Sequence, residues 1–153
     1  MNQERHDSSG ELLLSTHTPD QWRRRRQELN EWINRPKVRK EPKRTRLFGD
    51  TSVDEQLYPI LIQLQKAGLE TEFSCAGVSP LDEPVDHSLY AYLTFFASGP
   101  AEKFANILMG NMRHRVLITY EPARQRYDVS SFFIGHNRSF CLLLQHSADQ
   151  LLI

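Results

Sequence analysis

The stretch from Ser88 to Ala97 constrains the fold of this chain most strongly, because its side chains alternate and it is rich in aromatic residues. A segment of this kind is typical of a β-strand with two different faces. The first face would carry Leu89, Ala91, Leu93 and Phe95, and the second Tyr90, Tyr92, Thr94 and Phe96. The second face is interpreted as part of a core or, alternatively, as a surface on which RNA bases stack.

Two helices are predicted in the body of the chain. Ser52 and Glu55 stand three residues apart, as in a capping box. Apolar residues at helical spacing follow them: Leu57, Ile60, Leu61, Leu64 and Ala67. Pro59 predicts a kink or a late start of this helix, and Gly68 its end. The second helix begins at Ser98-Gly99-Pro100, with proline in its first turn.

Further strands are predicted at four places: Leu69 to Ser74, Val116 to Tyr120, Tyr127 to Ile134 and Phe140 to Gln145. The resulting order, α-β-β-α-β-β-β, indicates the α+β class, with a mainly antiparallel sheet and two helices on one face. We expect residues 1–46 to form a disordered start, a basic helix and an extended arm, and residues 47–153 to form the α+β domain.

The net charge of zero hides a segregation of charge along the chain. Between Gln21 and Arg46 there are eleven basic and three acidic residues, which gives +8, whereas residues 47–153 have seven basic and twelve acidic residues, which gives −5. Such a basic segment suits an external polyanion such as RNA or DNA. It also suits the acidic body of the same chain or of a second copy, so a homo-oligomer with an exchanged arm is an alternative.

The basic segment is predicted to begin with a helix from Pro19 to about Asn34, capped by Thr18 and Gln21. Its basic side chains would pair with phosphates, and its tryptophans would stack on unpaired bases or dock the helix on the body. The candidate nucleic-acid-binding residues are Trp22, Arg23, Arg24, Arg25, Arg26, Arg35, Lys37, Arg39, Lys40, Lys43, Arg44 and Arg46.

A second candidate site is the turn Ser74-Cys75-Ala76-Gly77, which we call the Ser-Cys-Ala-Gly turn. Small residues let a backbone approach a ligand closely, and successive amides in such a turn can bind an anion. The candidate ligand-binding residues are Asp54, Ser74, Cys75, Gly77 and His87. Cys75 is either a ligand-contacting or reactive thiol, or a small buried residue at a strand end. No metal site is predicted, because Cys-x-x-Cys and His-x-x-x-His spacings do not occur.

The segments Ser52-Val53-Asp54-Glu55 and Thr71-Glu72-Phe73-Ser74-Cys75-Ala76-Gly77 together resemble the opening block of the wybutosine-synthesis tRNA methyltransferase family. The likeness covers residues 52–77. Small uncharacterised bacterial and phage proteins have a similar Ser-Cys-x-Gly turn before an aromatic strand. The positions carried over from the family are Ser52, Asp54, Glu55, Thr71, Ser74, Cys75 and Gly77. This resemblance implies a cytosolic protein that acts on tRNA with S-adenosylmethionine as methyl donor.

The sequence therefore predicts a small cytosolic protein that binds RNA or a nucleotide through its basic arm and its Ser-Cys-Ala-Gly turn. Met1 to Gly10 has no apolar core of a signal peptide, and no apolar run is long enough to cross a membrane. Two alternatives remain open. One is an S-adenosylmethionine-dependent tRNA-modifying enzyme, and the other is a non-catalytic protein–protein interaction module.

Overall fold

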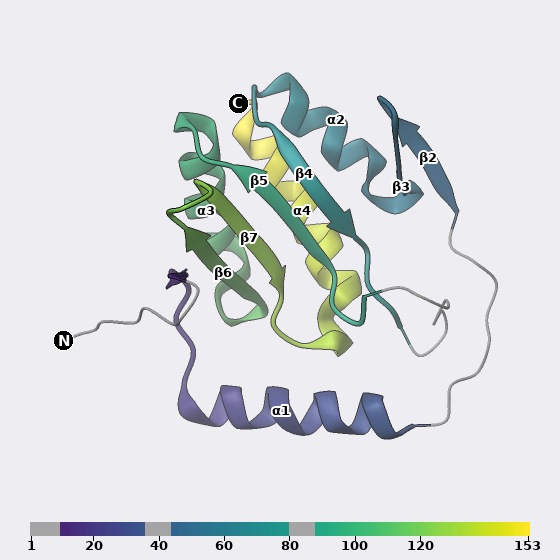
Figure 1. The fold of residues 1–153 in the computed structure, drawn as a ribbon, viewed down its shortest axis with the longest axis vertical. Coiled ribbons are helices and arrows are strands. Elements are labelled where there is room, and N and C mark those ends of the chain that lie inside the picture. Colours follow the sequence, from purple (N-terminus) through teal and green to yellow (C-terminus); the bar gives the residue numbers. More distant parts are fainter. Residues whose placement is uncertain (1–9, 36–43, 80–87) are drawn as a thin grey trace.

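The computed structural model describes residues 10–35, 44–79 and 88–153 (Figure 1). Within these ranges the chain forms a five-stranded sheet in the order β1-β6-β7-β5-β4 and a separate two-stranded sheet, β2-β3. Every strand pair in the two sheets is antiparallel. The strands are β1 (Leu12–Leu13), β2 (Thr45–Phe48), β3 (Thr51–Asp54), β4 (Thr71–Cys75), β5 (Tyr92–Phe96), β6 (Val116–Glu121) and β7 (Arg126–Ser131).

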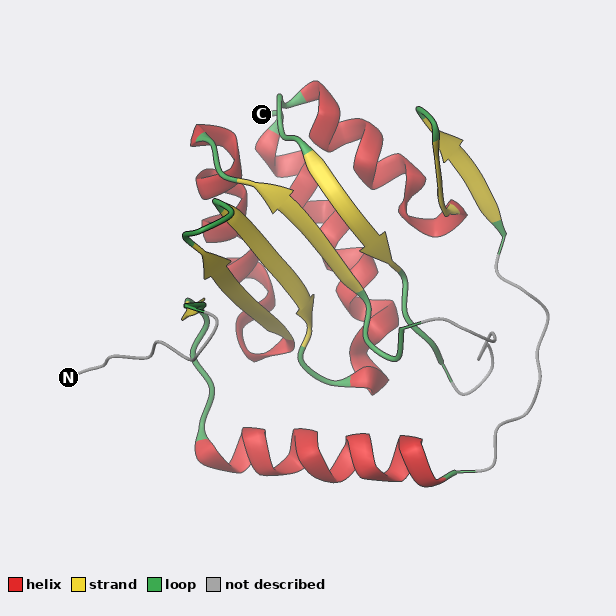
Figure 2. Cartoon of the chain, viewed as in Figure 1, coloured by secondary structure: helices red, strands yellow, loops and turns green. Residues whose placement is uncertain are grey.

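Four α-helices accompany the sheets in the described ranges: α1 (Pro19–Asn34), α2 (Tyr58–Lys66), α3 (Gly99–Met112) and α4 (Asn137–Leu151). Helices α3 and α4 cover one face of the larger sheet, and α1 runs across the ends of the strands (Figure 2). Helix α2 packs against α4 beside the edge strand β4. The predicted α+β class, with a mainly antiparallel sheet, is therefore confirmed.

Local sequence rules account for the starts of α1 and α3. The Thr18 hydroxyl accepts a hydrogen bond from the Gln21 amide at 3.1 Å, and the Gln21 side chain accepts one from the Thr18 amide at 2.8 Å, so the predicted capping box is present. Ser98 caps α3 in the same way through the Ala101 amide, at 3.1 Å. The side chains of Thr18 and Ser98 therefore determine where α1 and α3 begin.

The predicted helix start at Ser52 is wrong. Residues 51–54 form β3, which pairs with β2 so that Thr45 and Arg46 face Asp54 and Val53. A 3-10 turn (Glu55–Leu57) then leads into α2, and Pro59 lies in the first turn of that helix. Proline is tolerated there because the first helical amides have no partner inside the helix, so the late start is confirmed.

The strand predicted from Phe140 to Gln145 is also wrong, because this segment belongs to α4. The buried residues of α4 follow a helical period along one side: Phe140, Cys141, Leu144, Ala148 and Leu151. Leu142 interrupts the apolar run and is 67% exposed. Because three leucines are consecutive here, the segment has the continuous apolar run that is typical of a buried strand, and the helical period was overlooked.

The core lies between the larger sheet and the helices behind it. It joins Leu93, Phe95, Ile118 and Val129 of the sheet to side chains of α2, α3 and α4. A smaller apolar cluster unites Trp32 of α1 with Val78 and Ile134. The predicted strand near Leu93 is present as β5; Leu93 and Phe95 on its first face lie in the core, whereas Tyr92 and Phe96 on its second face are only partly buried. In the described part of the chain, no helix combines the length and apolarity needed to cross a membrane.

Candidate functional site

The Ser-Cys-Ala-Gly turn begins with Ser74 and Cys75, the last two residues of β4, and Cys75, Ala76 and Gly77 are buried. Cys75 is 6% exposed and Ala76 5% exposed. The Ala76 amide donates a hydrogen bond to the Asp54 carboxylate at 2.7 Å, and the Gly77 amide donates one to the Cys75 sulfur at 3.4 Å. The two amides that were expected to bind an anion are thus used by groups of the same chain.

Asn137, the first residue of α4, holds this turn against the rest of the fold. Its Nδ2 donates to the carbonyls of Val78 and Leu89, both at 2.8 Å. Its Oδ1 accepts from the Ala91 amide at 3.0 Å and from the Ser131 hydroxyl at 2.6 Å. This buried side chain therefore joins the chain after β4, the approach to β5 and the end of β7 by four hydrogen bonds.

Gly77 is required by this close packing. Its φ of +76° lies in the left-handed region, which side chains other than glycine rarely adopt. A Cβ atom at this position would lie 2.6 Å from the Ala91 amide nitrogen and would overlap the Asn137 side chain. Glycine at position 77 therefore allows the Ser-Cys-Ala-Gly turn to pack closely against Ala91 and Asn137.

The structure places the predicted ligand-binding residues as parts of a structural turn. Asp54 accepts the Ala76 amide, Cys75 and Gly77 are buried, and Ser74 is half-buried opposite Leu93. His87 lies outside the described residues. The described part of the chain contains no group of three or more His, Cys, Asp or Glu side chains that could hold a metal ion. Of the two interpretations of Cys75, the small buried residue at a strand end agrees with this geometry.

Helix α1 is fixed to the body through one of its faces. The Arg25 guanidinium donates to the Phe132 carbonyl at 2.6 Å and lies 4.2 Å from the centroid of the Tyr90 ring. The Glu28 carboxylate accepts the amides of Ile134 and Gly135 at 2.6 and 2.9 Å. A positive and a negative side chain thus satisfy backbone groups of the segment between β7 and α4.

The two tryptophans of α1 take part in this docking. Trp32 is 7% exposed and packs with Val78 and Ile134. The Trp22 ring meets the Phe132 ring edge to face, with 5.0 Å between their centroids. Of the two interpretations given to the tryptophans, docking on the body is the one that the structure supports.

Three arginines remain exposed on the outer side of α1: Arg23, Arg24 and Arg26. Arg23 and Arg24 both pair with Asp20, which precedes them by three and four residues, about one turn of the same helix. Their carboxylate partner therefore belongs to the basic helix itself and not to the acidic body. The alternative in which the body neutralises these arginines has no support in the described contacts.

Of the remaining basic candidates that the structure describes, Arg35 lies at the end of α1, whereas Arg44 and Arg46 lie away from it. Arg35 lies over the Trp32 ring at 4.4 Å, and Arg46 lies over the Tyr58 ring at 4.0 Å. Arg44 and Arg46 belong to the region of β2, which lies beside α2 and away from α1 (Figure 1). The other predicted residues fall outside the described residues: Lys37, Arg39, Lys40 and Lys43.

Sequence reasoning missed the structural roles of Asn137 and Glu28 and the hydrogen bond from Arg25 to the Phe132 carbonyl. Asn137 lies between the strands predicted from Tyr127 to Ile134 and from Phe140 to Gln145, and Glu28 was counted only among the three acids of the basic segment. Apart from Ser131, the partners described for these three residues are 46 to 107 residues distant in sequence. Comparisons of the chain with protein-family models, with curated proteins and with solved structures found no match.

Proposed function

We propose that this chain is a small cytosolic protein that binds RNA through the basic residues of α1 and of the segment that follows it. The observation that carries the proposal is the exposure of Arg23, Arg24 and Arg26 on a helix whose opposite face is docked. A docked helix fixes the backbone that carries these side chains, so less conformational entropy is lost when they meet phosphates than if the segment were free.

Arginine suits this role because its planar guanidinium can form two hydrogen bonds with one phosphate. Residues 36–43 add four further basic side chains and one acid directly after α1 in the sequence. The RNA would be held mainly by its backbone, because Trp32 is buried and Trp22 contacts Phe132. We therefore expect binding that depends on salt and little on base sequence.

The test compares the full chain with the triple variant Arg23→Gln, Arg24→Gln, Arg26→Gln. Affinity for a fluorescently labelled single-stranded RNA is measured by anisotropy between about 50 and 200 mM salt. Three lost phosphate contacts should weaken binding at least tenfold and reduce the slope of log affinity against log salt by about 2.

The matched control is Lys66→Gln, Lys103→Gln, Arg124→Gln, which removes three exposed positive charges outside α1. It should bind RNA nearly as tightly as the unchanged chain. Equal losses in the two triple variants would show that only net charge matters and would contradict a site on α1. Absence of salt-dependent binding by the unchanged chain would contradict RNA binding itself.

A further inference from the structure

The face of the larger sheet opposite α3 and α4, which we call the open face, has a regular arrangement of polar and aromatic side chains. In Figure 2 both helices lie behind the sheet and this face is turned toward the viewer. Strand pairing sets its central residues in three rows across β7 and β5: Ser130 with Tyr92, Asp128 with Thr94, and Arg126 with Phe96. Cys75 of β4 continues the first row beside Tyr92.

A cavity of about 420 Å³ lies on the open face. Its base consists of Tyr92, Thr94, Asp128 and Ser130, and Phe73, Tyr90 and Arg126 also line it. This volume falls within the range of small-molecule sites in proteins, which are mostly 300–1,000 Å³. Aromatic rings and a few polar groups are also the usual composition of such sites.

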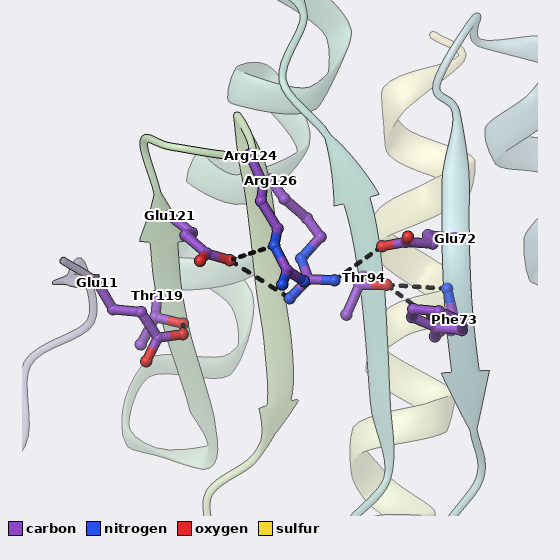
Figure 3. A network of polar contacts seen from close by, with 8 residues as sticks. All are labelled: Glu11, Glu72, Phe73, Thr94, Thr119, Glu121, Arg124 and Arg126. Carbon is purple, nitrogen blue, oxygen red and sulfur yellow. Dashed lines mark hydrogen bonds and ion pairs between the residues drawn. The ribbon is translucent and has the colours of Figure 1, made fainter. Parts of the chain in front are cut away.

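A β-bulge in β4 brings Phe73 to this cavity. Between Thr71, which pairs with Phe95, and Ser74, which pairs with Leu93, one extra residue interrupts the alternation. Glu72 and Phe73 therefore both lie opposite Thr94, and the Phe73 amide donates to the Thr94 hydroxyl at 2.8 Å (Figure 3). The Phe73 side chain is 55% exposed, so its ring is available to a ligand.

Asp128 is the half-buried acid at the base of the cavity. It lies between Thr94 and Thr119 on the neighbouring strands, and burial raises the pKa of its carboxyl. Arg126 attracts it electrostatically, but the Arg126 guanidinium bonds to Glu72 at 2.8 Å and to Glu121 at 3.5 Å (Figure 3). Among the described residues, no hydrogen bond or ion pair to the Asp128 carboxylate is present.

The electrostatic environment of the open face is negative. Four acids lie on or beside it, Glu11, Glu72, Glu121 and Asp128, against three arginines: Arg124, Arg126 and, beside the Tyr90 ring, Arg25. The pKa of the Tyr92 hydroxyl is raised chiefly by burial, and the carboxylates of Asp128 and Asp54 act in the same direction, so both add negative potential at this ring. A phosphate would be repelled here, whereas a cation would be attracted.

We propose that this cavity binds a small organic cation with N–H donors, such as an alkylguanidinium or a primary alkylamine. The Asp128 carboxylate would accept its N–H groups, together with the hydroxyl oxygens of Ser130 and Thr94. The rings of Tyr92 and Phe73 would contact its carbon atoms or the face of the cation. A contact of a guanidinium with an aromatic ring already occurs beside the cavity, because the Arg25 guanidinium lies on the ring of Tyr90, which lines it.

The test is a titration of the isotopically labelled full chain, followed by the shifts of its amide NMR signals. The probes are n-butylguanidinium, n-butylamine and the neutral n-butylurea, which has nearly the shape of the guanidinium. We expect saturable shifts at Thr94, Asp128 and Ser130 with one or both cations, and none with n-butylurea. The relative affinity of the guanidinium and the amine identifies the preferred cation.

The variant Asp128→Asn keeps the shape of the side chain and removes its charge, so it should lower the affinity for the cation at least tenfold. Asp50→Asn, an exposed position in the β2–β3 turn, is the matched control and should leave the affinity unchanged. The NMR spectrum of each variant reports directly whether it is folded. Equal binding of n-butylurea, undiminished binding by Asp128→Asn, shifts confined to other surfaces, or no saturable shift would each overturn the proposal.

Discussion

At the scale of single residues, Asn137 contributes most clearly to the fold, because one buried amide satisfies four polar groups from three segments. Buried polar groups that lose their partners cost about 1–3 kcal/mol each, whereas a satisfied hydrogen bond contributes less. The orientation of the Asn137 side-chain amide also fits its hydrogen-bond partners. Its NH₂ group faces two carbonyls, and its oxygen faces an amide and a hydroxyl.

We expect Asn137→Ala to lower the free energy of unfolding by about 3 kcal/mol, because it leaves four groups unpaired and a small void. Asn137→Asp should be worse, because a buried carboxylate oxygen would face the carbonyls of Val78 and Leu89. Urea unfolding measures both changes. Asn30→Ala, an exposed position on α1, is the control and should change stability by less than about 0.5 kcal/mol. A small effect of Asn137→Asp would contradict the assigned orientation of the amide.

At the scale of elements, α1 is attached to the body by chemically different contacts at its two ends. Near its start, His17 stacks on Phe132 with 3.9 Å between the ring centroids, and its Nε2 lies 3.0 Å from the Ser15 hydroxyl. Toward its end, Trp32 is buried in the small apolar cluster. Burial lowers the pKa of His17 to about 4, and the positive charges of Arg25 and His114 act in the same direction.

This lowered pKa makes the docking of α1 sensitive to acid. Between pH 6.5 and about 4 the unfolded chain binds a proton at His17 and the folded chain does not, so stability falls as the pH drops through this window. We expect a loss of about 1 kcal/mol from His17, since its half-exposed ring is screened by solvent. His136 should add a change of the same sign, because burial lowers its pKa too.

The emission of Trp22 and Trp32 reports the docking of α1 directly, since they are the two tryptophans of the chain. Acidification from pH 7 to about 4.5 should shift their emission to longer wavelengths. His17→Phe keeps the stacked ring without a titrating group, so its shift should occur at a lower pH. His146→Phe, at an exposed position on α4, should behave like the unchanged chain. An identical pH profile for His17→Phe would rule out His17 as a source of the acid sensitivity.

At the scale of the whole molecule, the exposed arginines of α1 and the acids of the open face lie in different places. The exposed arginines of α1 lie across the strand ends, and the acids of Figure 3 lie on the open face. A single polyanion is therefore not expected to spread from α1 over the sheet. The two proposed sites suit ligands of opposite charge, and each can be disabled without altering the other.

Asp128 also connects the open face to the stability of the whole fold. Its pKa is raised in the folded protein, chiefly by burial, so the folded state holds the proton more tightly than the unfolded state. Stability should consequently decrease as the pH rises through this raised pKa. At pH 7 we expect Asp128→Asn to raise the midpoint of urea unfolding above that of the unchanged chain. A lower midpoint would show that the carboxylate makes a stabilising interaction in the folded chain.

Much of the fold could be predicted because its signals are local. The caps at Thr18 and Ser98, the glycine after α2 and the alternation near Leu93 each act within a few residues. The β2–β3 hairpin had such a signal as well, since Gly49-Asp50 joins Phe48 to Thr51 as a two-residue turn. It was missed because Ser52 and Glu55 also matched a helix cap.

The sites were harder to predict because they depend on distant pairing. The Ser-Cys-Ala-Gly turn reads as a binding loop until Asn137, about sixty residues later, is known to pack on it. The cavity forms only when β7 lies beside β5, which places Asp128 and Ser130 next to Thr94 and Tyr92. The bulge that turns Phe73 outward is likewise a property of strand register.

The pairing of β1 with β6 has a consequence for biosynthesis. Leu12 and Leu13 leave the ribosome more than a hundred residues before their partners, Tyr120 and Thr119. The contacts of Arg25 and Glu28 likewise wait for residues 132–135. During translation the first helix therefore remains undocked, with its two indole rings in water, until the C-terminal third of the polypeptide has been made. Nascent chains stalled before residue 116 should accordingly be digested by protease within residues 10–35, and completed chains should resist.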